Sequence, residues 1–343
     1  MKLLKNNKEI GSDFWDIPLL IKPNSFFSNY TWFISGRAAL RAILQQIINE
    51  NSGQRHLKAA LPSFLCESMV LPFIKEKIEY KFYSVTIKDN AFQYDYSDVK
   101  DCNIILVIDY FGYESFNNNF PSRDKTIIRD LTHSIFIKDY KDADFYYGSL
   151  RKWAGFVCGG FAFKESFTFQ QPKENNHDYI EKRIRAMREK AKFIDGKIDN
   201  KQYLNCFFAS EMMLDDCQIA RCLDEDVDAA NHLDINYLKA KRRENAEVLI
   251  NGLKKYCIIK KLGDNDCPLF VPILCKNRDK LRTFLKENDI FCPIHWPKFS
   301  NNNLSERLYD QELSLVCDQR YTKEDMQRIV RMVMTFMEND KNA

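Results

Sequence analysis

The stretch with the clearest chemical potential contains a lysine preceded by a serine and followed by two glycines. Lys152 lies three residues after Ser149, just beyond a short apolar run, and the pair Gly159 and Gly160 follows. A lysine amine can attack a carbonyl carbon and form a Schiff base. Because most lysines are simply exposed on the surface, this spacing alone is weak evidence, and its meaning depends on the groups that accompany Lys152.

An aspartate ends a predicted strand upstream of this lysine. The apolar residues at 126–128 lead directly to Arg129 and Asp130, and open α/β sheets bind their ligands at the carboxyl ends of their strands. Asp130 is therefore a candidate ligand-binding carboxylate. The competing interpretation is an ordinary aspartate at a strand end or turn.

A helix start offers a third group of donors. Ser35 precedes Gly36, Arg37 and a run in which apolar residues recur at intervals of three and four, so a helix is predicted to begin at Gly36 with Ser35 as its cap. A helix N-terminus presents free N–H groups and a positive dipole end to a phosphate, and Ser149 can add a hydroxyl donor. The competing interpretation is a capped core helix.

These groups together match the needs of one cofactor. A pyridoxal-phosphate enzyme needs a lysine amine for a Schiff base, a carboxylate for the pyridine nitrogen, and hydroxyl or backbone donors for the phosphate. Lys152, Asp130 and the helix start at Gly36 supply a candidate for each need. Pyridoxal 5'-phosphate is therefore the predicted cofactor.

Two histidines are further candidates. His133 has three interpretations: a neighbour of the cofactor, a metal ligand beside Asp130, or a structural histidine. Because only two potential ligands cluster there and no third histidine or cysteine follows at ligand spacing, no metal site is predicted. His295 lies between prolines and precedes Trp296. It is a candidate substrate contact, although a single loop histidine is more often structural.

The pattern of apolar runs predicts the fold. Short apolar runs that alternate with helix-length segments predict an α/β fold with a mostly parallel sheet; they lie at 57–61, 104–108, 126–128 and 144–147. Periodicity predicts long amphipathic helices at 178–193 and 212–253, and further elements at 258–259, 269–274, 278–287, 314–317 and 323–337. The predicted domains are a large cofactor-binding domain (1–215), interdomain helices (216–255) and a small C-terminal α+β domain (256–343).

The overall composition disfavours several partners and locations. Fifty-one Lys and Arg against forty-eight Asp and Glu give a net charge of +3, which is too small for a typical nucleic-acid-binding surface. No apolar stretch approaches the roughly 18 residues of a membrane span, and the N-terminal residues lack an apolar signal core. Eleven scattered cysteines without a CxxC pair indicate reduced thiols, so a cytoplasmic location is predicted.

Five stretches, in this order, resemble the DegT-type aminotransferase family, which consists of pyridoxal-phosphate enzymes of fold type I best known for acting on nucleotide sugars. They are FISGRAAL (33–40), LPSFLCES (61–68), YFG (110–112), DLTH (130–133) and SLRK (149–152). The likeness extends through 211–245, which is similar to the family's interdomain helices, and through 293–297, which resembles its C-terminal substrate-side loop. The resemblance covers most of the chain and implies the aspartate-aminotransferase-like fold of that family.

Carried over to this sequence, the resemblance implies a role for each matching residue. Lys152 would form the Schiff base, Asp130 would bond the pyridinium nitrogen, and His133 would lie beside the ring. Phe64 and Cys66 occupy the stretch where many members place an aromatic side chain on the cofactor. The implied cofactor-binding residues are Ser35, Gly36, Arg37, Phe64, Cys66, Asp130, His133, Ser149 and Lys152, and the implied substrate contacts are His295 and Trp296.

The activity implied by the resemblance is transfer of an amino group from an amino-acid donor, glutamate, to a keto substrate, a keto-sugar nucleotide. A homodimer whose active sites are completed by the partner chain is implied as well. Lys152 departs from the common sugar aminotransferases, in which a longer gap separates the serine from the lysine. Two alternatives remain: another pyridoxal-phosphate reaction on a sugar or amino compound, and a catalytically silent binding or assembly subunit, against which the retained Lys152, Asp130 and Ser149 weigh.

Overall fold

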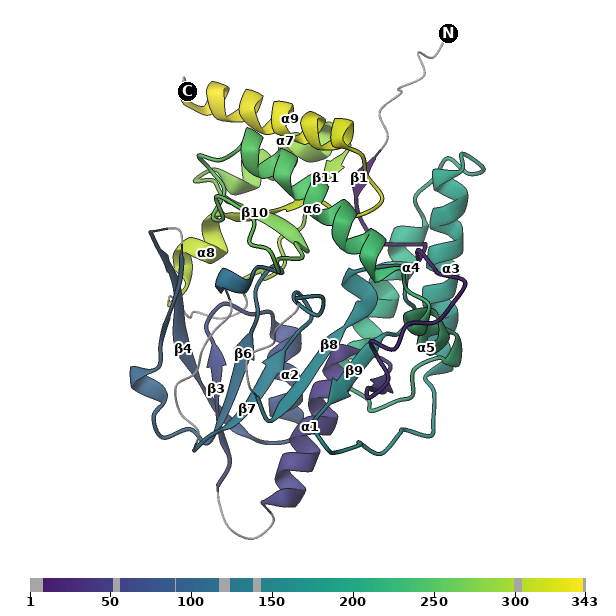
Figure 1. The fold of residues 1–343 in the computed structure, drawn as a ribbon, viewed down its shortest axis with the longest axis vertical. Coiled ribbons are helices and arrows are strands. Elements are labelled where there is room, and N and C mark those ends of the chain that lie inside the picture. The colour runs from purple at the N-terminus through teal and green to yellow at the C-terminus, as the bar shows by residue number, and fades with distance from the viewer. Residues whose placement is uncertain are drawn as a thin grey trace.

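An eight-stranded sheet forms the centre of the molecule. The computed structural model describes residues 9–51, 56–89, 91–116, 124–137, 143–298 and 304–341. The sheet order is β2-β9-β8-β7-β6-β3-β4-β5 (Figure 1). Its strands are β2 (Thr31–Phe33), β3 (Lys58–Pro62), β4 (Glu79–Lys88), β5 (Ala91–Asp95), β6 (Ile104–Ile108), β7 (Thr126–Asp130), β8 (Phe145–Ser149) and β9 (Gly160–Phe163).

The five strands in the middle of this sheet run parallel, whereas β2, β5 and β9 pair antiparallel with their neighbours. Every residue of β6 is buried, as expected for a parallel strand covered on both faces. The predicted strands at 57–61, 104–108, 126–128 and 144–147 correspond to β3, β6, β7 and β8. The carboxyl ends of β7 and β8 bring Asp130 and Ser149 to the same edge of the sheet.

Helix α1 (Gly36–Glu50) begins at the residue that the sequence predicts. The Ser35 hydroxyl accepts a hydrogen bond from the Ala38 N–H at 3.2 Å and caps the helix. Strand β9 passes very close to this cap, because a Cβ at Gly160 would lie 2.2 Å from the Ser35 carbonyl carbon. Glycine at this position therefore lets β9 approach the start of α1. Helix α2 (Glu67–Lys75) follows β3.

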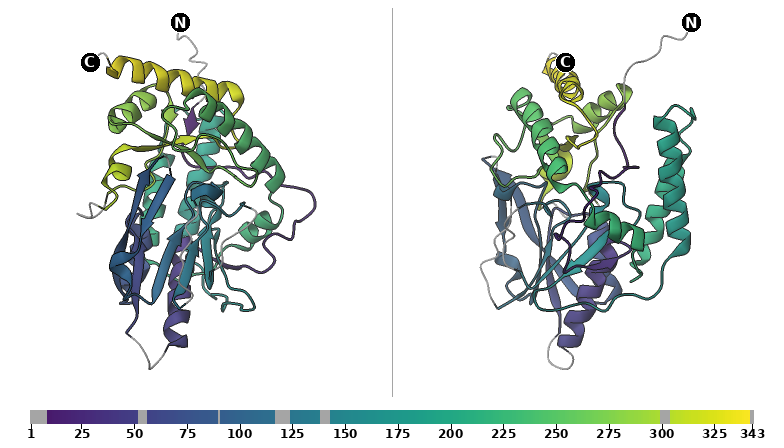
Figure 2. Two further views of the ribbon diagram at one scale, coloured as in Figure 1. Left: turned by 60° about the vertical axis from the view of Figure 1, so that its left-hand side comes forward. Right: turned by 45° about the vertical axis from the view of Figure 1, so that its right-hand side comes forward.

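A group of helices follows the last strand of the sheet. They are α3 (His177–Ile194), α4 (Tyr203–Met212), α5 (Asp224–Asn231) and α6 (Ile235–Gly252), and α3 and α4 lie side by side at one edge of the molecule (Figures 1 and 2). The helical run predicted at 212–253 is interrupted. The short 3-10 helix η4 (Met213–Asp216) ends at Cys217, whose positive φ of 53° breaks the helical path, and the next helix starts only at Asp224.

A second, smaller core lies beyond α6. It contains the antiparallel pair β10 (Phe270–Leu274) and β12 (Glu312–Val316), with the helices α7 (Arg278–Glu287), α8 (Glu306–Gln311) and α9 (Lys323–Lys341) around it. The strand predicted at 258–259 does not form, because pairing there is limited to an isolated bridge between Cys257 and Ile273. None of the described helices is both long and apolar enough to cross a membrane.

The N-terminal strand belongs to this second core. Strand β1 (Ile10–Gly11) pairs in parallel with β11 (Ile290–Phe291), and the Ile10 side chain packs among core residues contributed by α6, α7 and α9. The Gly11 N–H donates to the Tyr321 hydroxyl oxygen at 2.8 Å. The boundaries 1–215, 216–255 and 256–343 stay predictions, and the pairing of β1 adds residues near the N-terminus to the C-terminal core.

A buried carboxyl in β12 makes the stability of this core dependent on pH. Burial raises the pKa of Glu312 to about 8, although the Ser314 hydroxyl donates to its Oε1 at 2.7 Å. Because the pKa is higher in the folded than in the unfolded state, the protein is most stable below about pH 4.5 with respect to this group and loses that stability as the pH rises toward 8. We expect Glu312→Gln to raise the free energy of unfolding at pH 7 by on the order of 3 kcal/mol, as measured by urea denaturation.

The same measurement at pH 4.5 should show a much smaller difference between Glu312→Gln and the parent, because the carboxyl is then neutral in the folded state and only about half ionised in the unfolded state. Glu287→Gln, which removes an exposed carboxylate from α7, is the matched control and should leave the free energy of unfolding unchanged within about 0.5 kcal/mol. Equal stability of Glu312→Gln and parent at pH 7 would contradict the assignment of a buried neutral carboxyl.

Candidate active site

A cavity of about 510 Å³ opens at the carboxyl edge of the central sheet. It lies between the ends of β6, β7 and β8, the start of α1, and residues of α3 and α4. The predicted site residues that line it are Gly36, Arg37, Cys66, Asp130, His133, Ser149, Lys152, His295 and Trp296. Residues distant in the sequence therefore share one cavity.

Two predicted cofactor-binding residues do not reach the wall of this cavity. The Ser35 hydroxyl caps α1, and the side chain is buried. The Phe64 ring is also buried, with its centroid 4.6 Å from that of Trp296 and 5.7 Å from that of Tyr110. Phe64 thus packs behind Trp296 and supports a residue that does line the cavity.

Lys152 lies between two histidines. It ends the 3-10 helix η3 (Leu150–Lys152), and its Nζ is 3.2 Å from His133 Nε2 and 3.3 Å from His295 Nδ1. Burial lowers the pKa of Lys152. Burial, together with the neighbouring lysine, holds the pKa of both histidines well below the usual range. This environment favours a neutral amine flanked by neutral imidazoles.

The hydrogen bonds of His133 identify its tautomer. The Phe111 N–H donates to His133 Nδ1 at 3.3 Å, so the proton of the neutral ring is on Nε2. The Nε2–H can then donate to Lys152 Nζ only if the amine has a free lone pair. Lys152 can in turn donate to His295 Nδ1. The arrangement orients the amine as a nucleophile or base.

Asp130 is held by two donors. Its Oδ1 accepts from the Thr132 N–H at 2.7 Å, and its Oδ2 accepts from the Tyr147 hydroxyl at 3.1 Å. Burial raises the pKa of Asp130, and these two hydrogen bonds and Lys152 act in the opposite direction. A buried carboxylate with fixed orientation is suited to hold a protonated ring nitrogen. Tyr147 was not among the predicted site residues, because its contact with Asp130 arises only from the pairing of β7 with β8.

The start of α1 and the end of β8 form the polar end of the cavity. The first N–H groups of a helix have no partner within the helix, and among the described residues those of Gly36 and Arg37 make no other hydrogen bond. Ser149 lies opposite, with its Oγ 3.4 Å from the Arg151 N–H that donates to it. Its hydroxyl hydrogen remains available. These donors fit a phosphate group.

A pair of arginines next to this end is held by one glutamate. Glu211 on α4 accepts from Arg37 Nη2 and from Arg151 Nη1, both at 2.8 Å. Desolvation raises the pKa of Glu211, whose side chain is partly exposed, but the two arginines outweigh it and lower the pKa. Asp215 adds a second contact to Arg37 at 3.2 Å. The side chain of Arg37, a predicted cofactor residue, is therefore engaged with α4 and η4, while its backbone faces the cavity. No pattern in the sequence indicates these ion pairs.

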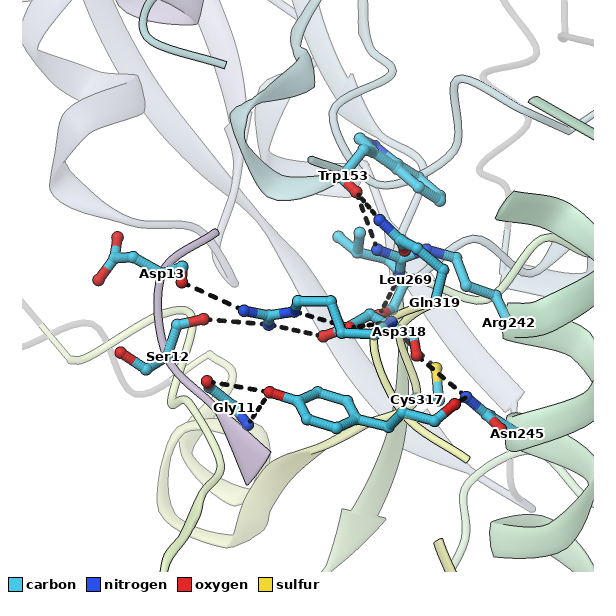
Figure 3. A network of polar contacts seen from close by, with 12 residues as sticks. Gly11, Ser12, Asp13, Trp153, Arg242, Asn245, Leu269, Cys317, Asp318 and Gln319 are labelled. Carbon is cyan, nitrogen blue, oxygen red and sulfur yellow. Dashed lines mark hydrogen bonds and ion pairs between the residues drawn. The ribbon is translucent and has the colours of Figure 1, made fainter. Parts of the chain in front are cut away.

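The residue after Lys152 is fixed by the second core, as Figure 3 shows. The Trp153 carbonyl oxygen accepts from Gln319 Nε2 at 2.7 Å and from Arg242 Nη2 at 3.4 Å. The Arg242 guanidinium also lies 4.7 Å from the centroid of the Trp153 ring. The indole N–H donates to the Thr132 carbonyl at 2.8 Å. Contacts from α6 and from the loop after β12 thus position the backbone beside Lys152.

One group of described residues has the composition of a metal site, and it lies elsewhere. Potential ligand atoms of Cys158, Cys222 and Asp226 are within 4.8 Å of one another, and all three residues are buried. The Asp226 oxygens already accept the N–H groups of Val157 at 3.2 Å and Cys158 at 2.5 Å. This carboxylate therefore serves the turn that leads to Gly159. His133 and Asp130 do not belong to the group.

Comparison with solved structures shows that the fold is shared with aminotransferases. A DegT DnrJ EryC1 StrS aminotransferase from Brucella abortus superimposes with a TM-score of 0.60 at 15% identity, covering 90% of this chain and 85% of that one. PseC of Helicobacter pylori, an aminotransferase involved in the biosynthesis of pseudoaminic acid, gives 0.59 at 13% identity, covering 96% and 100%. Spr1654 of Streptococcus pneumoniae in its PLP form gives 0.61 at 12% identity, covering 92% and 88%.

These similarities confirm the predicted fold class, an α/β fold with a mostly parallel sheet and a smaller C-terminal unit. No protein-family model matches the sequence, and no curated protein sequence matches it either. The likeness is therefore one of structure, and the chemistry must be argued from the residues of the cavity.

Proposed function

We propose that this chain, which has the fold of the DegT-type aminotransferases, is a pyridoxal-phosphate-dependent aminotransferase that moves an amino group from an amino-acid donor, glutamate, to a keto-sugar nucleotide. One observation carries the proposal. The amine of Lys152, placed between two neutral histidines, shares a cavity with the buried carboxylate of Asp130 and with the free N–H groups at the start of α1. These are the groups that this cofactor requires.

The residues of the cavity fit the two ends of the cofactor. Gly36, Arg37 and Ser149 would hold the phosphate through backbone N–H groups and a hydroxyl, and Asp130 would hold the ring nitrogen in its protonated form. When bound, pyridoxal phosphate supplies a carbonyl carbon for the lysine and a ring that accepts electron density from the substrate. Spr1654, which has the same fold, has been solved in a PLP form and a PMP form.

Lys152 would then serve as the proton-transfer group. Its free Nζ would take a proton from the substrate carbon as a positioned general base and, as the resulting ammonium, would act as the general acid. The Nε2–H of His133, 3.2 Å from Nζ, orients the amine lone pair. His295 on the other side, 3.3 Å away, accepts a hydrogen bond from the same amine. The two histidines thus set the orientation of the Lys152 amine and favour its neutral form.

We further propose that two copies of the chain form a homodimer in the cytoplasm. Phe208 and Met212 of α4 are exposed apolar residues, at 70% and 54% exposure, and Met212 lines the cavity. A second copy on this face would cover them. The eleven cysteines form no disulfide among the described residues, which supports a reducing location. Analytical ultracentrifugation of the purified protein tests the dimer.

The function is tested with the purified protein and added pyridoxal phosphate. We expect a visible absorption band that borohydride reduces, conversion of the bound cofactor by glutamate alone, and release of the amino group to a keto-sugar nucleotide in a coupled assay. A band without conversion by any amino donor would leave another reaction of the same cofactor as the better proposal. No band at all would refute the enzyme and support a binding or assembly role.

A further inference from the structure

A buried arginine lines the cavity without a hydrogen bond. Arg183 of α3 is only 5% exposed, and among the described residues no side chain or backbone group forms a hydrogen bond with it. Its buried Nε lacks a partner. Arg183 forms an ion pair with Asp13, in which Oδ1 lies 3.6 Å from Nη1, beyond hydrogen-bonding distance.

This state is unusual for a guanidinium. The group has five N–H donors and stays charged, and the ion pair with Asp13 balances its charge but leaves its hydrogen-bond donors unsatisfied. The other two arginines that line the cavity, Arg37 and Arg151, both pair with Glu211 at 2.8 Å. Of the arginines lining the described cavity, Arg183 is therefore the one whose donors remain available for a ligand.

The guanidinium of Arg183 is held in place in advance. Its Cζ lies 4.5 Å from the centroid of the Phe207 ring on α4, and Phe207 is itself buried. On another side stands Asp13, whose backbone carbonyl accepts from Arg320 Nη1 at 3.1 Å. Figure 3 shows Ser12 and Asp13 at one end of a polar network that also contains Asp318. The aromatic ring and the carboxylate orient the group without using its hydrogen-bond donors.

The position of Arg183 favours a substrate over the cofactor. Asp13, its neighbour, lines both the main cavity and a second one of about 380 Å³, and Lys152 and His295 line both as well. The two cavities therefore meet near the lysine amine. The phosphate donors come from other elements, the start of α1 and the end of β8. A group bound to Arg183 would enter the space where a substrate must approach Lys152.

We infer that Arg183 is the anion-binding residue of the substrate site and that it binds a carboxylate of the amino donor. A planar guanidinium and a carboxylate form two parallel hydrogen bonds, a geometry suited to a group whose plane is already fixed. The inference rests on the proposed function, and it adds the residue that selects an acidic donor. A phosphate of the acceptor nucleotide shares the same anion chemistry, so the experiment separates the two sources.

The first test measures binding to the protein without cofactor, by isothermal titration calorimetry with glutarate and with inorganic phosphate. We expect Arg183→Gln to weaken glutarate binding by about tenfold to hundredfold. Arg183→Lys keeps the charge but loses the paired geometry, so an intermediate loss is expected. Arg185→Gln is the matched control, because Arg185 is on the same helix, 70% exposed and paired with Glu189 at 2.8 Å. The affinity of this variant for glutarate should equal that of the parent.

The second test uses the cofactor-loaded protein and measures each half-reaction. Arg183→Gln should raise the KM for glutamate by about tenfold to hundredfold, with the affinity for pyridoxal phosphate and the KM of the acceptor unchanged. A loss confined to the acceptor, or a loss of cofactor affinity, would assign Arg183 to a phosphate and overturn the inference. So would unchanged glutarate binding in both Arg183 variants. If Arg183→Gln does not fold, the same measurements on Arg183→Lys test the inference.

The cofactor absorption band distinguishes failure of this inference from failure of the proposed function. Formation of the band depends on Lys152 and does not require Arg183. A parent protein that forms the band but binds glutarate no better than its Arg183→Gln variant contradicts the inference alone. A parent protein that forms no band contradicts the proposed function, whatever the glutarate titration shows.

Discussion

Replacing Lys152 by alanine is expected to remove the borohydride-reducible absorption band completely and to lower the rate of amino transfer by about 10⁴-fold or more. Under the proposed function, the variant would lose both the amine that attaches the cofactor and the base that moves the substrate proton. Added pyridoxal phosphate should still bind through the donors at the start of α1, so a spectrum of the free aldehyde bound to the protein is expected. Absorption spectroscopy and single-turnover kinetics with glutamate measure the two effects.

Lys197→Ala is the control for this experiment. Lys197 is exposed and pairs with Asp195 at 2.8 Å, so its loss removes a positive charge without touching the cavity. The band and the rate should match those of the parent. A Lys152→Ala variant that retained the reducible band would show that another amine attaches the cofactor, and the role of Lys152 would have to be abandoned.

Replacing Asp130 by asparagine is expected to lower the rate of amino transfer by about 10²- to 10³-fold while leaving the cofactor attached to Lys152. Asparagine retains an acceptor for the Thr132 N–H, which now bonds Oδ1 at 2.7 Å. It cannot, however, stabilise a positive charge on the ring nitrogen. We expect the loss in kcat rather than in cofactor affinity, because the proton on the nitrogen matters most when electron density moves into the ring.

Asp95→Asn is the comparison for Asp130→Asn. Asp95 also ends a strand, β5, but at the far edge of the sheet, where it is exposed. Its replacement should leave kcat unchanged. If Asp130→Asn retained the full rate with saturating glutamate, the carboxylate would serve only to hold Tyr147 and Thr132, and the ring nitrogen would need another partner.

The parts of the site that were predictable from sequence are those tied to a local pattern. Lys152 and Asp130 stand next to short apolar runs, and parallel strands bring their carboxyl ends to one edge whatever connects them. Gly36 was identifiable because a cap and an apolar period mark the helix start. In each case, a few neighbouring residues determine which helix or strand forms and at which of its two ends the functional group lies.

The remaining features depend on contacts between distant segments. Arg183 lies on an amphipathic helix with several other basic residues, and only its packing against Phe207 of α4 distinguishes it. Glu211 pairs with Arg37 and Arg151, which are 174 and 60 residues away. The role of Phe64 stays a prediction, since its ring packs against Trp296, which lines the cavity, and only this contact between distant segments shows where the ring lies.

The pairing of β1 with β11 has a consequence for the order in which the protein is made. The central sheet uses residues 31–163, so it can assemble while synthesis continues. The second core must wait, because Ile10 and Gly11 find their partners only when β11 and Tyr321 have emerged from the ribosome. Gln319, which fixes the backbone beside Lys152, arrives at the same late moment. The nascent chain therefore contains Lys152 well before it contains the residue that supports the backbone beside this lysine.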